Sequence, residues 1–170
     1  MIRLPSPKEK YQYLIKNTAS RDDMVYSFQQ LADQWLAEKR EKKAIECLDY
    51  AMQVLEESTS TEERVTLASL YHQVGHLWRQ LGNHKLTGMY YKKALKLYKD
   101  IHTSAPHYDH AASHFILASF LDQIWKLKPA QFHYERALDM MAQVKDKDSK
   151  EVAAIKQKLA GVNQKLLNRT

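Results

Sequence analysis

Histidine is the residue type whose spacing in this sequence most invites a chemical role. His72 and His76, and again His110 and His114, are four residues apart, so on a helix each pair would place two imidazoles on one face. Zinc takes three or four ligands, and neither pair has a nearby Glu in the arrangement that hydrolytic zinc sites use. We therefore predict no functional metal and no other cofactor. A pH response around His72 and His76 is favoured over metal binding, because histidine gains charge close to neutral pH.

Catalytic residues are not grouped anywhere in the chain. The sequence has no Gly-rich phosphate loop, no nucleophile elbow and no motif that pairs a base with a nucleophile. Its single cysteine, Cys47, lies within a helical pattern, and we expect it to pack in a core rather than to react. We predict that the protein is not an enzyme. One unpaired cysteine, no apolar signal region and no apolar run long enough for a membrane span together predict a cytoplasmic protein.

The composition indicates which elements must position these residues. The chain has 170 residues, of which 44% are hydrophobic and 27% are charged, as expected for a folded domain. Only 4 glycines and 4 prolines are present, which is too few for a fold of many strands and turns. Residues that favour helices far outnumber Val, Ile and Thr. The composition therefore predicts an all-α fold.

A pattern of large and small residues repeats every 43 residues in three successive units. In each unit a large residue is followed by further packing residues on the same helical face, and a second helix then carries small, large and small residues. The repeated positions are Phe28, Leu31, Ala32, Trp35, Ala44, Leu48 and Ala51, then Tyr71, Val74, Gly75, Trp78, Thr87, Tyr91 and Ala94, then His114, Leu117, Ala118, Leu121, Ala130, Tyr134 and Ala137. Small residues allow two antiparallel helices to approach closely while large residues fill the space between them.

This spacing resembles the tetratricopeptide repeat (TPR), a helix-turn-helix unit, over about residues 20 to 144. The period is longer than the usual repeat and is similar to the longer-helix subclass found in kinesin light chain and in bacterial peptide-responsive regulators. Three positions depart from the family pattern. The second repeat has the expected turn glycine, Gly82, but Lys39 and Trp125 replace it in the first and third repeats. In the third repeat His114 also stands in a position where a large apolar residue is expected.

The resemblance implies a right-handed α-solenoid of three TPR-like helix hairpins with capping helices at both ends. We predict an N-terminal cap with a short helix at 1–19, repeats at 20–61, 62–104 and 105–148, and a C-terminal capping helix at 149–170. Serines precede the predicted helices and are expected to cap them: Ser6, Ser20, Ser60, Ser104 and Ser149. We expect Tyr11, Leu14 and Ile15 to cover the first repeat, and Pro106 to lie in the first turn of the third.

In this family the first helix of each pair lines a concave face. The positions one, two, five and eight residues after each large apolar residue are the predicted peptide-binding residues: Gln29, Gln30, Asp33, Leu36, His72, Gln73, His76, Arg79, Phe115, Ile116, Ser119 and Asp122. Most can form hydrogen bonds, and Phe115 with Ile116 would provide an apolar pocket, which together suit a peptide segment of another protein. Ordinary solvated positions are the alternative interpretation. TPR domains that hold a chaperone's C-terminal carboxylate use Lys, Asn and Arg in such positions. Here the corresponding residues are Gln29, Asp33, Gln73, Ala112 and Ile116, so we do not expect a carboxylate clamp of that kind.

Charge is distributed unevenly along the chain. The first repeat is acidic and the second is basic, with Lys92, Lys96 and Lys99 on one face of its second helix. A solvated outer face is the favoured interpretation of these lysines, because aromatic residues do not interleave with them as nucleic-acid binding would require. Weak self-association of acidic and basic repeats is a further possibility. We predict an adaptor or scaffold that binds a partner's peptide segment; a small chaperone for a secreted or aggregation-prone client and a nucleic-acid-binding array are the alternatives.

Overall fold

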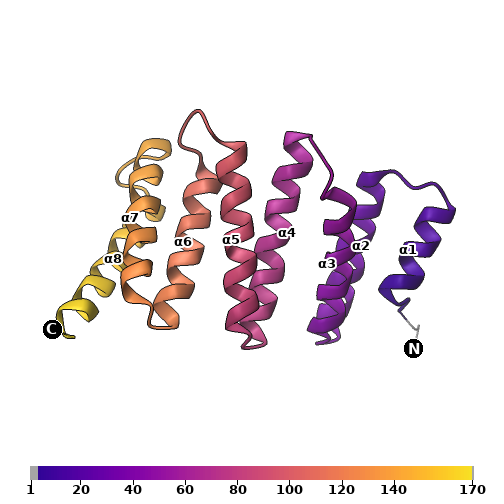
Figure 1. Ribbon diagram of the computed structural model, residues 1–170, viewed down its shortest axis with the longest axis horizontal. Helices are drawn as coiled ribbons and strands as arrows, with labels where there is room; N and C mark the ends of the chain where they lie inside the picture. The colour runs from indigo at the N-terminus through magenta and orange to yellow at the C-terminus, as the bar shows by residue number, and fades with distance from the viewer. Residues whose placement is uncertain (1–3, 170) are drawn as a thin grey trace. The chain divides into compact units, whose positions relative to one another are not determined.

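The computed structural model describes residues 4–169 as α-helices joined by short loops, with no strand among them (Figure 1). This confirms the all-α prediction. The helices are α1 (Pro7–Lys16), α2 (Arg21–Ala37), α3 (Glu41–Leu55), α4 (Thr61–Gln80), α5 (His84–Ile101), α6 (Tyr108–Gln123), α7 (Leu127–Val144) and α8 (Lys150–Leu167). The chain divides within α5 into a first unit, Met1–Thr87, and a second unit, Gly88–Thr170. No helix within 4–169 combines the length and the apolar character that a membrane crossing requires.

The 43-residue period is visible in the backbone at the turn between the two helices of each pair. Lys39, Gly82 and Trp125 have positive φ angles of 57°, 72° and 59°. In each turn the following backbone N–H donates to a carbonyl near the end of the first helix, at 2.9 Å from Arg40 to Trp35, from Asn83 to Trp78 and from Lys126 to Leu121. This left-handed residue satisfies carbonyls that the helix end would otherwise leave unpaired. The turn geometry is therefore kept even where glycine is replaced.

Most predicted helix starts are capped as expected. Ser6 forms a capping box with Glu9, and the hydroxyl oxygens of Ser20 and Ser149 accept hydrogen bonds from backbone N–H groups in the first turns of α2 and α8. Ser60 is the residue before α4, but its side chain forms no capping hydrogen bond. The predicted start at Ser104 is wrong. Helix α6 begins at Tyr108, and the imidazole of His107 caps it by accepting a hydrogen bond from the N–H of Asp109.

The core of the first unit is built on the predicted repeat positions of α2 and α3. All seven of these positions are buried, and α1 packs against both helices. Tyr11 of α1 stacks on Tyr50 with ring centroids 5.0 Å apart, and Leu14 is buried. Ile15 is 53% exposed, so the expectation that it covers the first repeat is wrong. Leu14 and Tyr11, three residues apart, occupy one helical face, whereas Ile15 lies roughly 100° away from Leu14.

In the second unit α7 packs between α6 and α8. Its core joins residues from α5 to α8, among them Tyr91, Phe120, Tyr134 and Ile155. Burial of Val152, Ile155 and Val162 confirms the apolar stripe expected of the C-terminal helix. Helix α8 therefore covers the last hairpin with one apolar face and turns a polar face to water.

Candidate functional site

The predicted binding residues of α2 and α4 all lie in the first unit, next to core positions. Gln30 and Asp33 on α2 are exposed, as are Gln73 and His76 on α4. The other four, Gln29, Leu36, His72 and Arg79, are half-buried. These side chains follow the fully buried Phe28 and the buried Tyr71 along their helices. Each helix therefore fixes the direction of its polar residues by burying the face beside them.

A hollow of about 330 Å³ lies between the N-terminal halves of α2 and α4. The residues that line this α2–α4 hollow are Asp22, Val25, Tyr26, Gln29, Leu55, Ser60, Glu62, Glu63 and Thr66. Gln29 is the predicted binding residue among them. The Tyr26 side chain is 64% exposed, and an ion pair of 3.5 Å joins Arg21 of α2 to Glu63 of α4. The hollow thus combines an amide, an exposed aromatic ring and three carboxylates, which sequence reasoning did not group because they come from helices 40 residues apart.

The predicted residues of α6, in the second unit, already have partners within the chain. The Tyr134 hydroxyl donates to Ser119 Oγ at 3.1 Å, and Lys165 of α8 forms an ion pair of 2.6 Å with Asp122. Phe115 and Ile116 are half-buried against the core of this unit. An occupying ligand would have to compete with these contacts at Ser119 and Asp122.

The C-terminal helix also contacts the exposed Trp125 in the last hairpin turn. Lys165 Nζ lies 5.5 Å from the Trp125 ring centroid, and the Arg169 guanidinium lies at the same distance of 5.5 Å. Cations over an indole ring stabilise such contacts modestly at exposed positions. Lys165 follows Asp122 by 43 residues, so α8 occupies the place that the first helix of a further repeat would take.

A second and larger hollow of about 610 Å³ lies in the second unit, between α5 and α7 with α6 beneath. The residues that line this basic groove are Lys92, Leu95, Lys96, Lys99, His110, His114, Leu117, Phe132, His133, Arg136 and Met140. None of these is acidic. The sequence-based interpretation of the lysines as one solvated helix face missed the histidines, Phe132 and Arg136 across from them.

Hydrogen bonding and burial set the charge state of the histidines in the basic groove. His114 Nδ1 and His133 Nδ1 are 2.9 Å apart, so one donates to the other. Burial, followed by the neighbouring His133 and His110 and by Arg136, lowers the pKa of His114 to about 3. Burial also lowers the pKa of His110, helped by His102 and Lys99, and the pKa of His133, helped by Lys92. These rings are therefore neutral at pH 7, and the fixed positive charge of the groove comes from the lysines and Arg136.

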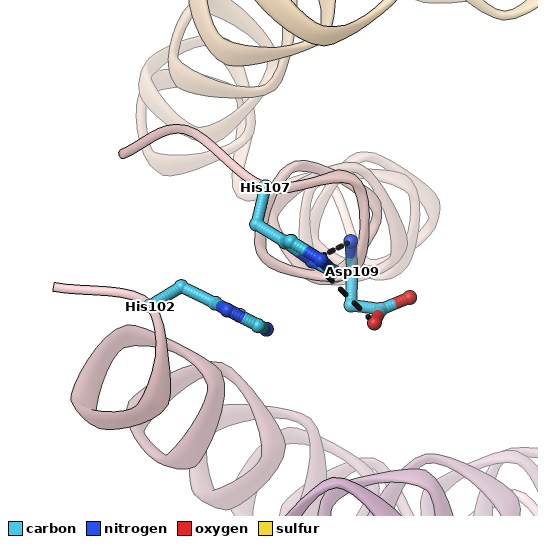
Figure 2. A group of neighbouring side chains, drawn as sticks. All are labelled: His102, His107 and Asp109. Atoms are coloured by element: carbon cyan, nitrogen blue, oxygen red, sulfur yellow. Dashed lines mark hydrogen bonds and ion pairs between the residues drawn. The ribbon is translucent and has the colours of Figure 1, made fainter. Parts of the chain in front are cut away.

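His102, His107 and Asp109 form a further cluster between α5 and α6 (Figure 2). One potential ligand atom from each residue lies within 4.8 Å of the others. The two imidazole rings are stacked, with centroids 3.6 Å apart and planes 9° from parallel. Parallel stacking directs ring faces rather than nitrogen lone pairs toward a shared point, and zinc would need a fourth ligand. The cluster shapes the start of α6, where His107 is the cap.

Cys47 is fully buried on α3, as expected for a packing residue. Burial, assisted by the nearby Glu46 carboxylate, raises the pKa of its thiol to about 12. A thiol that remains protonated and inaccessible is a poor nucleophile.

Solved structures of helical repeat proteins match this chain over most of its length. BtubC from P. vanneervenii aligns with a TM-score of 0.72 and 20% identity, covering 94% of this chain. The TPR-like repeats of a protein assigned as a kinesin light chain from Podosopora anserina align with a TM-score of 0.70 and 16% identity, covering 96% of this chain and 78% of theirs. The present chain spans 62% of the length of BtubC.

A third similar structure is the first TPR domain of Spaghetti (RPAP3), bound to an HSP90 peptide. It aligns with a TM-score of 0.52 and 14% identity, covering 84% of this chain and 93% of that one. No protein-family profile matches the sequence, and no curated protein matches it either. The resemblance stated from the sequence is confirmed at the level of structure: this chain has the all-α fold of the TPR-like helical repeat proteins.

Proposed function

We propose that the protein is a non-catalytic interaction module, an adaptor or scaffold, that binds a peptide segment of a partner protein along the exposed faces of α2 and α4. The observation that carries this proposal is the α2–α4 hollow, which includes the predicted residue Gln29 and is flanked by further exposed polar side chains on both helices. A surface hollow lined by a few convergent polar groups is the usual form of a recognition site.

The residues of this face suit the main chain of a peptide. Glutamine amides both donate and accept hydrogen bonds, as peptide groups do, so Gln29 and Gln73 can pair with an extended backbone. Tyr26 offers an exposed ring against which a side chain can pack. The carboxylates of Asp22 and Glu62 at the edge of the hollow favour Lys or Arg in the bound segment.

Peptide binding is a known use of this fold, since the solved TPR domain of RPAP3 holds the HSP90 peptide SRMEEVD. That peptide is acidic. The acidic edge of the α2–α4 hollow would repel such a ligand, so we propose a basic or mixed peptide segment instead. The four predicted residues on α6 are secondary in this proposal, because Ser119 and Asp122 have partners in their own unit.

A peptide-display selection on the purified full chain tests the proposal. Peptides selected on the wild type are labelled, and their affinity is measured for the triple variant Gln29→Ala, Gln73→Ala, His76→Ala. We expect at least a tenfold loss, about 1.4 kcal/mol, from the removal of three hydrogen-bonding side chains. The matched control replaces exposed residues of α3, Lys42→Ala and Gln53→Ala, and should bind normally.

Equal affinity of the triple variant and the wild type would refute this placement of the site. Enrichment of unrelated apolar sequences, without a shared pattern, would favour the chaperone alternative over an adaptor.

A further inference from the structure

The basic groove of the second unit has the dimensions of a docking site for a short helical segment. Its α5 wall runs from Lys92 to Lys99 and its α7 wall from Phe132 to Met140. At 1.5 Å per residue these walls are about 10–12 Å long, which equals about two turns of a helix. With a volume of about 610 Å³ it is the largest of the hollows described above.

Charge in the groove has one sign. Lys92, Lys96 and Lys99 line the α5 side and Arg136 lies on the α7 side, all of them exposed. The lysines follow one another by four and three residues, so they form one row along the helix. His110 and His133 are neutral at pH 7 because burial and these neighbouring cations lower the pKa of each. A ligand in the groove therefore meets several fixed positive charges and no negative charge from the lining.

Between the charged walls the groove contains apolar side chains beside the neutral histidines. Leu117 of α6 and Leu95 of α5 lie in the groove with Met140, which is half-buried. Phe132 is 54% exposed, so its ring is accessible to a ligand in the groove. Methionine and phenylalanine at a groove of this kind can hold an aliphatic or aromatic side chain of a partner.

From this arrangement we infer that the basic groove is a second binding site, specific for an acidic, amphipathic segment of a partner protein that inserts a large apolar side chain between Phe132 and Met140. Carboxylates one turn apart on the partner would face the lysine row of α5, and the anchor side chain would cover the half-buried Leu95. The site is distinct from the α2–α4 face, which favours the opposite charge.

A polypeptide fits the lining better than a nucleic acid does. Single-stranded nucleic acids bind through successive aromatic platforms on which bases stack, together with a basic track. Phe132 is the one aromatic residue of this groove apart from the histidines, and the other uncharged lining residues, Leu95, Leu117 and Met140, are aliphatic. Aliphatic side chains beside a row of lysines match the alternation of apolar and acidic residues on one face of a helix.

The experiment uses the full chain and a displayed library of about 14-residue helical peptides in which acidic and apolar positions are randomised. Selected peptides carry a fluorescent label, and their affinity is measured by anisotropy at two salt concentrations. We expect enrichment of acidic sequences with a Leu or Phe anchor. The double variant Lys92→Glu, Lys96→Glu should weaken binding at least about tenfold, and Phe132→Ala by about fivefold or more.

A matched control separates this site from general charge. Lys128→Glu with Lys158→Glu makes the same change in net charge at exposed positions of α7 and α8 that do not line the groove. Binding by this control should stay within about threefold of the wild type. NMR titration supplies a second readout, because a bound carboxylate favours protonated imidazole and should raise the pKa of His110 or His133.

Several outcomes would overturn the inference. Equal losses of peptide affinity in both double variants would show that binding depends only on net charge. Unchanged pKa values of His110 and His133 on peptide addition would show that the peptide binds outside the groove. A single-stranded RNA oligonucleotide that outcompetes every selected peptide would assign the groove to nucleic acid. Salt-sensitive self-association that Lys92→Glu and Lys96→Glu abolish would assign it to a second copy of this chain.

Discussion

Replacing Lys39 with glycine should stabilise the protein. Lys39 lies in the turn between α2 and α3 with a φ of 57°, in the left-handed region that residues with a Cβ adopt at a cost. Its side chain is exposed, and the backbone hydrogen bonds of the turn, from Lys39 to Leu36 and from Arg40 to Trp35, do not depend on it. The substitution therefore changes the backbone preference and little else.

The expected gain is the difference between two effects. Holding a non-glycine residue in the left-handed region costs about 1–2 kcal/mol. Glycine in turn makes the unfolded chain more flexible, which costs about 0.5–1 kcal/mol on folding. The net stabilisation of Lys39→Gly should be about 0.5–1 kcal/mol, or about 1–4 °C in Tm for a chain of this size.

The equivalent positions of the other two hairpins act as internal controls. Gly82→Ala should destabilise by about 1 kcal/mol, and because a Cβ there meets no atom within 4 Å, the loss reports the backbone alone. Trp125→Gly should gain little, because it removes the contacts of the ring with Lys165 and Arg169, each about 0.5 kcal/mol. Urea unfolding followed by far-UV circular dichroism measures all three. A Lys39→Gly protein less stable than the wild type would refute the reasoning.

Three further predictions concern the buried groups. Because the pKa of His114 is lowered to about 3, the unfolded chain binds a proton below about pH 6.5 that the folded chain does not, so the free energy of unfolding should decrease as the pH is lowered. On the order of 1 kcal/mol should be lost through His114 by about pH 5, after allowing for its partial exposure, and urea unfolding of His114→Gln should show a smaller total loss than the wild type, because His110 and His133 still contribute. Asp122→Asn breaks the ion pair with Lys165 and should speed amide hydrogen exchange in α8 several-fold, whereas unchanged exchange would show that the apolar stripe alone holds the helix. Cys47 should resist alkylation at neutral pH in the folded protein and react fully in urea, and rapid labelling of the native state would contradict its burial.

The fold was predictable because packing residues in a helical repeat recur at a fixed spacing. All predicted packing positions of α2 and α3 are buried. Lys39 and Trp125, which stand in place of the turn glycine, still adopt the left-handed conformation that the repeat requires. Local exceptions were harder to predict. Ser104 has the right residue type for a helix cap, but the residue before Pro106 is held out of the helical conformation, and His107 supplies the cap instead.

The candidate sites were less predictable than the fold. Positions on α2 and α4 could be assigned from the repeat, yet the carboxylates that give the α2–α4 hollow its charge belong to no repeated pattern. His114, which breaks the apolar pattern, is half-buried and hydrogen-bonded to His133 from the neighbouring helix. A histidine in a packing position and a row of lysines on one helix were the sequence signals that pointed toward the basic groove.

The order and type of the helices, the pairing of α2 with α3 and of α6 with α7, and the left-handed turns follow from the sequence pattern, because periodic burial and turn geometry are local or act between neighbouring helices. Only the tertiary structure decided which charges share a surface. Lys92 and Arg136 are far apart in sequence and line one groove because α5 and α7 both pack on α6, and Asp122 is taken by Lys165 because α8 occupies the place of a next repeat. Long-range electrostatic and apolar surfaces depend on which faces the packed helices leave uncovered, and no single helix contains that information.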